Sequence, residues 1–98
     1  MKKLLYLVLF LFNLAVFSQN EALFEKANTL YNEGKYAEAI TQYQAILGTN
    51  NHSAEIYFNL GNAYYKLNRI APTIYFYEKA LRLSPNDTDI INNLAMAR

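Results

Sequence analysis

The feature that most constrains this chain is an internal repeat with a period of 34 residues. Residues of the same or similar type stand that distance apart, as in the pairs Asn28 and Asn62, Tyr31 and Tyr65, and Tyr43 and Tyr77. The same shift carries Ile56 and Leu60 onto Ile90 and Leu94, so a third copy begins near the C-terminus. Self-similarity at a fixed period of this size indicates a stacked architecture of supersecondary units.

Helical spacing of apolar residues predicts the content of each unit, and no segment shows sustained strand alternation. The predicted helices cover residues 22–33, 36–47, 53–67, 70–83 and 88–98. Ser53 suits the N-cap of the third helix, and Gly48 suits the C-terminal end of the second. Pro72 lies two residues after Ile70, where a first helical turn tolerates it. The sequence therefore predicts an all-α fold of five short helices, arranged as two helical hairpins and the first helix of a third.

The first 18 residues have a different character from the repeats. Two lysines precede an apolar run over residues 4–17, and Ser18 follows. This arrangement is typical of a secretory signal, and the run is shorter than the roughly 18–20 apolar residues that usually span a bilayer. With Val16 at −3 and Ser18 at −1, we expect cleavage before Gln19 and export to the periplasm or cell envelope of a bacterium; the alternative is an uncleaved anchor.

Composition excludes several functional classes. Without residues 1–18, seven basic side chains face eight acidic ones, a formal charge of −1, and no basic cluster for nucleic acid remains. The chain has no cysteine for a disulfide or a zinc site. His52 is the only histidine and lies in a predicted loop. We therefore predict no catalytic, metal-binding or cofactor-binding residue, no small-molecule substrate, and a protein that is not an enzyme.

The run YFNLGNAYYKLNRIAPTIYFYEKALRLSP resembles the tetratricopeptide repeat. The family signature falls on Tyr57, Leu60, Gly61, Tyr64, Thr73, Tyr77, Ala80 and Pro85. The resemblance divides the chain into a first repeat over 20–53, a second over 54–87, and the first helix of a partial third repeat, or a cap, over 88–98. Thr73 departs from the usual small alanine, which makes tight packing there less certain. The first copy departs from the signature at Lys26 and Asn51.

Gly61 raises a choice between a ligand-binding turn and a packing position. A phosphate-binding glycine would require a glycine-rich loop after a strand, and neither is present. Ala27 and Ala95 occupy the same position in the other copies. The pattern therefore favours close helix packing at Gly61, despite a cost of about 1 kcal/mol for glycine inside a helix.

The resemblance implies a concave groove lined by the first helix of each repeat. The candidate partner-binding residues on that face are Phe24, Asn28, Tyr31, Phe58, Asn62, Tyr65, Asn92 and Met96. Asparagine can pair with a peptide backbone through both a donor and an acceptor, and the aromatic residues supply contact area. These residues favour a protein–protein interaction module that binds an extended peptide or a partner protein; the alternative is a solvated face with incidental aromatic residues.

Some members of this family hold a C-terminal carboxylate through basic residues and asparagine. Asn28 and Asn59 match two asparagine positions of that clamp, whereas Phe24, Asp89 and Asn93 replace its basic residues. We therefore expect an apolar or aromatic ligand rather than an acidic one.

A finer resemblance rests on the FSQ ending of the signal, on LGNAYYKLNRIAPTI and on the C-terminal SPND-DI-NNLAMAR. These stretches are similar to the repeat protein of the bacterial aerotolerance (Bat) operon, a membrane-associated family with a spanning helix and an SH3-like domain downstream, which this sequence does not contain. The resemblance implies a role in an envelope complex. Two alternatives are self-association, with a homodimer formed through Ile91 and Leu94 of the last helix, and an accessory subunit that scaffolds a membrane-bound enzyme complex.

Overall fold

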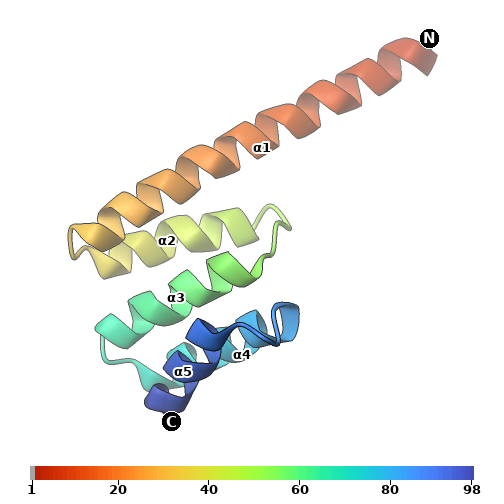
Figure 1. Ribbon diagram of the computed structural model, residues 1–98. Helices are drawn as coiled ribbons and strands as arrows, with labels where there is room; N and C mark the ends of the chain where they lie inside the picture. Colours follow the sequence, from red (N-terminus) through yellow and green to blue (C-terminus); the bar gives the residue numbers. More distant parts are fainter. Residues whose placement is uncertain (1) are drawn as a thin grey trace.

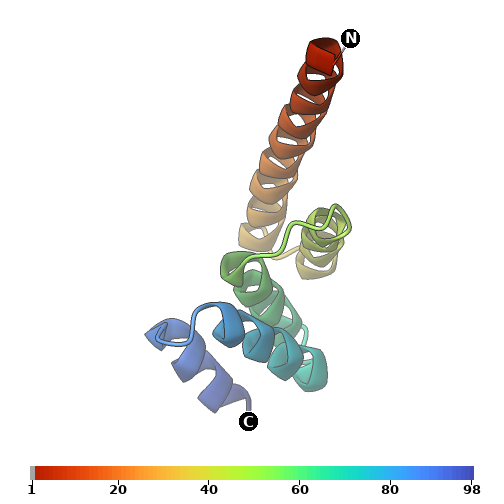
Figure 2. The same cartoon turned by 90° about the vertical axis from the view of Figure 1, so that its right-hand side faces the viewer.

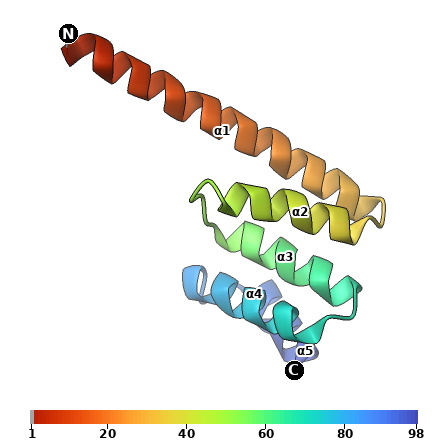
Figure 3. The ribbon, with the colours of Figure 1, turned by 180° about the vertical axis from the view of Figure 1, so that it is seen from behind.

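The computed structural model describes residues 2–98, which form five α-helices joined by short turns (Figure 1). The helices are α1 (Lys2–Asn32), α2 (Tyr36–Leu47), α3 (Ala54–Lys66), α4 (Ile70–Leu83) and α5 (Thr88–Ala97). None of the described residues lies in a β-strand. Each helix packs against the next one in the chain, and the rear view shows α2, α3 and α4 stacked in order (Figure 3). The predicted all-α repeat solenoid is confirmed.

Helix α1 is longer than the sequence-based prediction of a first helix beginning near Ala22. It runs through the apolar segment and the first repeat as one helix of 31 residues, because no proline or glycine interrupts residues 2–32. Its N-terminal half projects beyond the other helices (Figure 2), and the large apolar side chains from Leu4 to Phe17 other than Val16 are 48–67% exposed. By length and composition α1 could cross a membrane, a property that signal sequences near an N-terminus share.

The two hairpin turns have the same geometry but different residues. Gly34 and Asn68 stand 34 positions apart and both adopt left-handed backbone angles, with φ of 80° and 60°. In each turn the next residue donates its N–H to a carbonyl in the last turn of the helix, Lys35 to Leu30 at 2.8 Å and Arg69 to Tyr64 at 3.0 Å. This is a common way to satisfy the free carbonyls at a helix C-terminus.

Side-chain caps define the starts of α3 and α5. Ser53 Oγ accepts a hydrogen bond from the backbone N–H of Ile56 at 3.1 Å, which confirms the predicted N-cap. Asp87 Oδ1 accepts from the two N–H groups of Asp89 and Ile90 in the equivalent position of α5. Gly48 follows α2 as expected, but its φ of −62° is helical. The left-handed residue in that loop is Asn50, whose φ is 62°.

The core lies between consecutive helices. One part joins α1, α2 and α3 through Ala27, Ala39, Ile40, Tyr43, Ile46, Ile56, Leu60 and Ala63, and the rest joins α3, α4 and α5 through Tyr57, Tyr77, Ala80, Ile90, Leu94 and Ala97. Thr73 is fully buried on α4, and its hydroxyl donates to the carbonyl of Arg69 at 2.7 Å. The polar group that distinguishes Thr73 from the usual alanine is therefore satisfied inside the helix pair.

The packing interpretation of Gly61 agrees with the contacts around it. A Cβ atom at Gly61 would lie 2.4 Å from two ring atoms of Tyr77, so the tyrosine fills the space that a larger residue would need. Ala27 occupies the same position in the first repeat and is fully buried. Ala95 is exposed, because no described helix covers that side of α5.

The last helix buries more than the sequence suggested. A homodimer through Ile91 and Leu94 requires both side chains to be exposed, and Ile91 is, at 42%. Leu94 is only 4% exposed, because it packs against Tyr77 in the α4–α5 contact. Exposure of both residues was therefore wrong for Leu94. Of the two side chains, Leu94 packs toward α4 and Ile91 lies toward solvent.

Candidate functional site

Three polar side chains meet where α1, α2 and α3 come together. Asn28 Oδ1 accepts a short hydrogen bond from the hydroxyl of Tyr43 and a longer one from Asn59 Nδ2 at 3.5 Å. Each residue comes from a different helix. Together they form a small network that we call the first triad.

The same network recurs one repeat later, where α3, α4 and α5 meet. Asn62 Oδ1 accepts from the Tyr77 hydroxyl at 2.5 Å and from Asn93 Nδ2 at 3.2 Å. All three residues stand 34 positions after their counterparts in the first triad. We call this the second triad; each triad crosses from one repeat into the first helix of the next.

The hydrogen bonds inside the triads determine which amide atoms remain for a ligand. The side-chain oxygens of Asn28 and Asn62 each accept two hydrogen bonds. The Nδ2 groups of both residues take no part in the triads and remain as donors for a ligand. Asn59 and Asn93 use their Nδ2 donor, which leaves the oxygen as an acceptor. In chain order the groups left for a ligand are therefore a donor at Asn28, an acceptor at Asn59, a donor at Asn62 and an acceptor at Asn93.

Two neighbouring depressions lie over the triads, and we call them together the groove. The first, of about 360 Å³, is lined by Asn28, Tyr31, Asn32, Tyr43, Asn59 and Asn62. The second, of about 260 Å³, is lined by Tyr31, Asn62, Tyr65, Lys66, Tyr77, Asn93 and Met96. Tyr31 and Asn62 contribute to both, so the two depressions share a wall. Lys66 is the only charged side chain among these lining residues.

The structure brings five of the eight candidate residues together at the groove: Asn28, Tyr31, Asn62, Tyr65 and Met96. Phe24 and Phe58 line neither depression and instead pack on the tyrosines of the triads. The ring centroids are 6.1 Å apart for Phe24 and Tyr43 and 5.8 Å apart for Phe58 and Tyr77. Asn92 is exposed on α5 and lines neither depression.

Sequence reasoning did not include Tyr43, Tyr77, Asn59 or Asn93 among the candidate groove residues, although it compared Asn59 and Asn93 with positions of the carboxylate clamp. The two tyrosines stand 34 residues apart at the same position of the repeat, and their rings are buried, at 1% and 2% exposed. Their hydroxyls nevertheless reach the asparagines of the first helices. The signal that could have found this network is the recurrence of Asn at a separation of 31 residues, from Asn28 to Asn59 and from Asn62 to Asn93.

Burial keeps the groove tyrosines in the neutral, hydrogen-bond-donating form. Desolvation raises the pKa of Tyr43 and of Tyr77 to about 12, although hydrogen bonds from Asn59 and Asn93 respectively act in the opposite direction. Burial, with a smaller contribution from neighbouring Tyr36, also raises the pKa of Tyr31. At neutral pH both triad hydroxyls therefore carry the proton that they donate to an asparagine oxygen.

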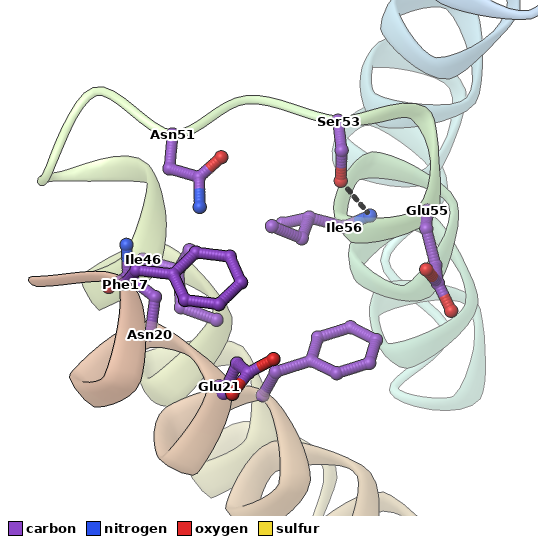
Figure 4. A pocket seen from close by; sticks show the side chains of 9 residues that line it. Phe17, Asn20, Glu21, Ile46, Asn51, Ser53, Glu55 and Ile56 are labelled. Carbon is purple, nitrogen blue, oxygen red and sulfur yellow. Dashed lines mark hydrogen bonds between the residues drawn. The ribbon is translucent and has the colours of Figure 1, made fainter. Parts of the chain in front are cut away.

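A third cavity, which we call the N-terminal pocket, lies between α1, the end of α2 and the start of α3 (Figure 4). It has a volume of about 250 Å³ and is lined by Phe17, Asn20, Glu21, Phe24, Ile46, Asn51, Ser53, Glu55 and Ile56. Phe24 is the candidate residue that lies here rather than in the groove. The floor is apolar, and the carboxylates Glu21 and Glu55 line it as well.

The described residues contain no cluster of metal ligands at these sites. Among residues 2–98 no cluster of three or more His, Asp or Glu side chains could hold a metal ion. His52 lies in the loop before α3, where its Nδ1 is 2.5 Å from the hydroxyl of Tyr57. The chemistry on offer at the groove is thus hydrogen bonding and apolar contact.

Comparison with known proteins agrees with this architecture. The family model described as tetratricopeptide repeat matches residues 24–88, which is more than half of the chain. A comparison with curated proteins found no significant match. The match spans α2, α3, α4 and residues 24–32 of α1, and the chain belongs to the tetratricopeptide repeat family.

Proposed function

We propose that this protein is an exported adaptor that binds an extended peptide segment of a partner protein in its groove. Tetratricopeptide repeats generally mediate protein–protein interaction and are typically not catalytic. The observation that carries the proposal is the repeated triad, which offers two equivalent sets of polar groups in one continuous groove.

The free amide atoms of the triads suit a peptide backbone. A backbone in extended conformation presents carbonyl acceptors and N–H donors in alternation. The groove offers Nδ2 donors at Asn28 and Asn62 and amide oxygens at Asn59 and Asn93 in alternation as well. Because these hydrogen bonds are made to the ligand's backbone, they provide affinity for many sequences. Contacts to the ligand's side chains must provide the selectivity.

The remaining lining favours uncharged side chains in the ligand over the groove. Tyr31 and Tyr65 are partly exposed aromatic residues, and Met96 is 70% exposed at the end of the second depression. Tyrosine and methionine supply adaptable apolar contact area at interfaces. The basic residues that a carboxylate clamp would use are replaced, and Lys66 lies alone at the edge.

Export with removal of residues 1–18 is supported by the register of the repeats. Helices α3 and α5 begin at Ala54 and Thr88, and the same register puts the start of the first repeat at Asn20. Acidic residues one position into the helix, Glu55 and Asp89, have a counterpart in Glu21. Acidic residues are favourable near a helix N-terminus. Glu21 lies in the middle of α1 in the full chain and would lie near a helix N-terminus only after cleavage.

We place the adaptor in the bacterial periplasm or cell envelope, within a complex of the Bat aerotolerance type. The support comes from the sequence: the apolar N-terminal segment, the LGNAYYKLNRIAPTI run and the SPND-DI-NNLAMAR tail. A structural role in self-association is the second candidate. It is favoured by one observation, the exposed Ile91 and Ala95 on α5, whose counterparts Tyr57 and Gly61 are buried.

The groove assignment is tested with peptides selected from a displayed library for binding to the full chain in detergent. Changing Tyr31 and Tyr65 together to alanine removes exposed contact area without emptying the core. We expect at least a tenfold loss of affinity, because a well-placed interface tyrosine contributes about 1 kcal/mol or more. Isothermal titration calorimetry measures the change.

The matched control is Tyr75→Ala, which removes a tyrosine that is 54% exposed on α4 and lines neither depression. It should bind the selected peptides as the unchanged chain does. Equal affinity of the double variant and the control would exclude the groove as the binding site. A dimer that dissociates on Ile91→Lys in light scattering, with no peptide selected, would support self-association instead.

A further inference from the structure

The N-terminal pocket is lined in part by acidic side chains, which the lining of the groove lacks. Asn20 is only 5% exposed, and its Nδ2 donates to Thr49 Oγ1 at 2.9 Å. Its Oδ1 is buried without a hydrogen-bond partner. A buried acceptor without a donor destabilises the folded chain, so a donor from a ligand would be favourable at this atom.

The charged groups around the same pocket are also acceptors. Glu21 on α1 and Glu55 on α3 line it from two sides, and no basic side chain is among its lining residues. Ser53 Oγ is already engaged as the cap of α3. The pocket therefore combines an apolar floor of Phe24, Ile46 and Ile56 with an acceptor-rich edge.

Phe17 is the one lining residue that belongs to the N-terminal segment rather than to the repeats. Its ring extends from α1 toward Ile56 (Figure 4). The side chain is 60% exposed, so it lies at the mouth of the pocket and is not part of the core. Cleavage after Ser18 would remove it and leave the repeats unchanged.

We propose that the N-terminal pocket is a binding site for a large apolar side chain that is followed by a basic group, and that Phe17 occupies its mouth until the signal is removed. This proposal rests on the proposed function, since the ligand is a peptide and the processed chain is the binding form. The apolar floor holds the side chain. The basic group donates to Asn20 Oδ1 and to the carboxylates of Glu21 and Glu55.

The pocket continues the groove along the same helix faces. On α3, Glu55, Asn59 and Asn62 follow i, i+4, i+7 spacing, and on α1 Glu21, Phe24 and Asn28 follow i, i+3, i+7 spacing. Residues at these spacings share one face of a helix. A bound peptide therefore has its basic part at Glu21 and Glu55 and runs toward Lys66 at the other end.

The test uses a probe that is too short to fill the groove, N-acetyl-phenylalanyl-arginine amide, and the full chain in detergent. Phe17→Ala opens the pocket, and Phe12→Ala is the matched control, an equally exposed leader phenylalanine that does not line it. Methyl NMR signals of Ile46 and Ile56 report on binding. We expect Phe17→Ala to bind about tenfold more tightly than the unchanged chain or the control, because the probe then no longer has to displace the part of the Phe17 ring that covers the mouth of the pocket.

A second arm tests the basic group. The arginine probe should bind more tightly than N-acetyl-phenylalanyl-glutamate amide, and changing Glu21 and Glu55 together to glutamine should remove that preference. Equal binding by Phe17→Ala and Phe12→Ala, or no preference for arginine, would overturn the proposal. The Tyr31 and Tyr65 alanine variant should still bind the probe, which separates failure of this pocket from failure of the groove.

Discussion

The two complete repeats contain the same polar network but different packing positions behind it. In the first, Ala27 is the small residue at the helix contact, and in the second Gly61 leaves its space to the ring of Tyr77. The triads themselves keep the same residue types, Asn28 with Tyr43 and Asn62 with Tyr77. The difference teaches that the hydrogen-bonded groups are the same in both repeats, whereas the small residue at the helix contact differs with the space that the neighbouring ring takes.

The largest expected difference concerns the small residues. Gly61→Ala should lower the free energy of unfolding by about 2 kcal/mol, because the new Cβ overlaps the buried Tyr77 ring by far more than a small adjustment can relieve. Ala27→Gly should lower it by about 1 kcal/mol through helix propensity alone. Urea unfolding followed by circular dichroism measures both values.

Combining Gly61→Ala with Tyr77→Leu provides the control for that comparison. If the ring causes the overlap, the double variant loses less stability than the two single changes together. A Gly61→Ala variant as stable as the unchanged chain would show that α3 and α4 can move apart freely.

A smaller and equal effect is expected from the tyrosine hydroxyls. Tyr43→Phe and Tyr77→Phe should each lower the free energy of unfolding by about 1 kcal/mol, since each removes one hydrogen bond to an asparagine oxygen. Tyr75→Phe, with an exposed side chain, should have no effect. If only one of the two tyrosine substitutions lowers the free energy of unfolding, the triads are not equivalent.

The same hydroxyls give a pH dependence with a definite sign. Their pKa is raised to about 12 in the folded chain from about 10 when unfolded, so the folded state holds the proton more tightly. The stability that this provides is complete below pH 10 and is lost as the pH rises toward 12. Changing both tyrosines to phenylalanine should flatten the loss over that interval in urea unfolding series.

The smallest effects are expected in the two turns. Asn68→Gly should raise the free energy of unfolding by about 0.5 kcal/mol and Gly34→Asn should lower it by a similar amount, because glycine adopts positive φ at lower cost. Thermal unfolding of both variants measures these two changes in stability. If both substitutions change stability in the same direction, the turns are not equivalent.

Much of this fold could be predicted from the sequence, because apolar periodicity and the turn residues are local signals. The Ser53 cap and the early Pro72 follow from neighbours in the chain, and the packing role of Gly61 follows from the alanines at the same position of the other copies. Less of the candidate site could be predicted from the sequence. Whether the Tyr43 hydroxyl points into the core or out to Asn28 depends on the angle between helices, which periodicity does not give.

The continuity of α1 shows a second limit. Two segments of different character, the apolar run and the repeat that follows Gln19, join in one helix because helix formation responds to the absence of a breaker. Sequence character marked the junction, but backbone geometry does not. The boundary at Ser18 therefore stays a prediction about processing.

The way each triad crosses a repeat boundary has a consequence for how such a chain can change length. Asn59 belongs to the second repeat but completes the network of Asn28 and Tyr43 in the first. Loss of residues 28–61 by unequal recombination would join Ala27 directly to Asn62, and the surviving Tyr77 and Asn93 would still meet an asparagine in register. A deletion one residue shorter would place the residues after the junction on a different face of the fused helix, so a change of length by a whole unit is the one that keeps the repeats in register.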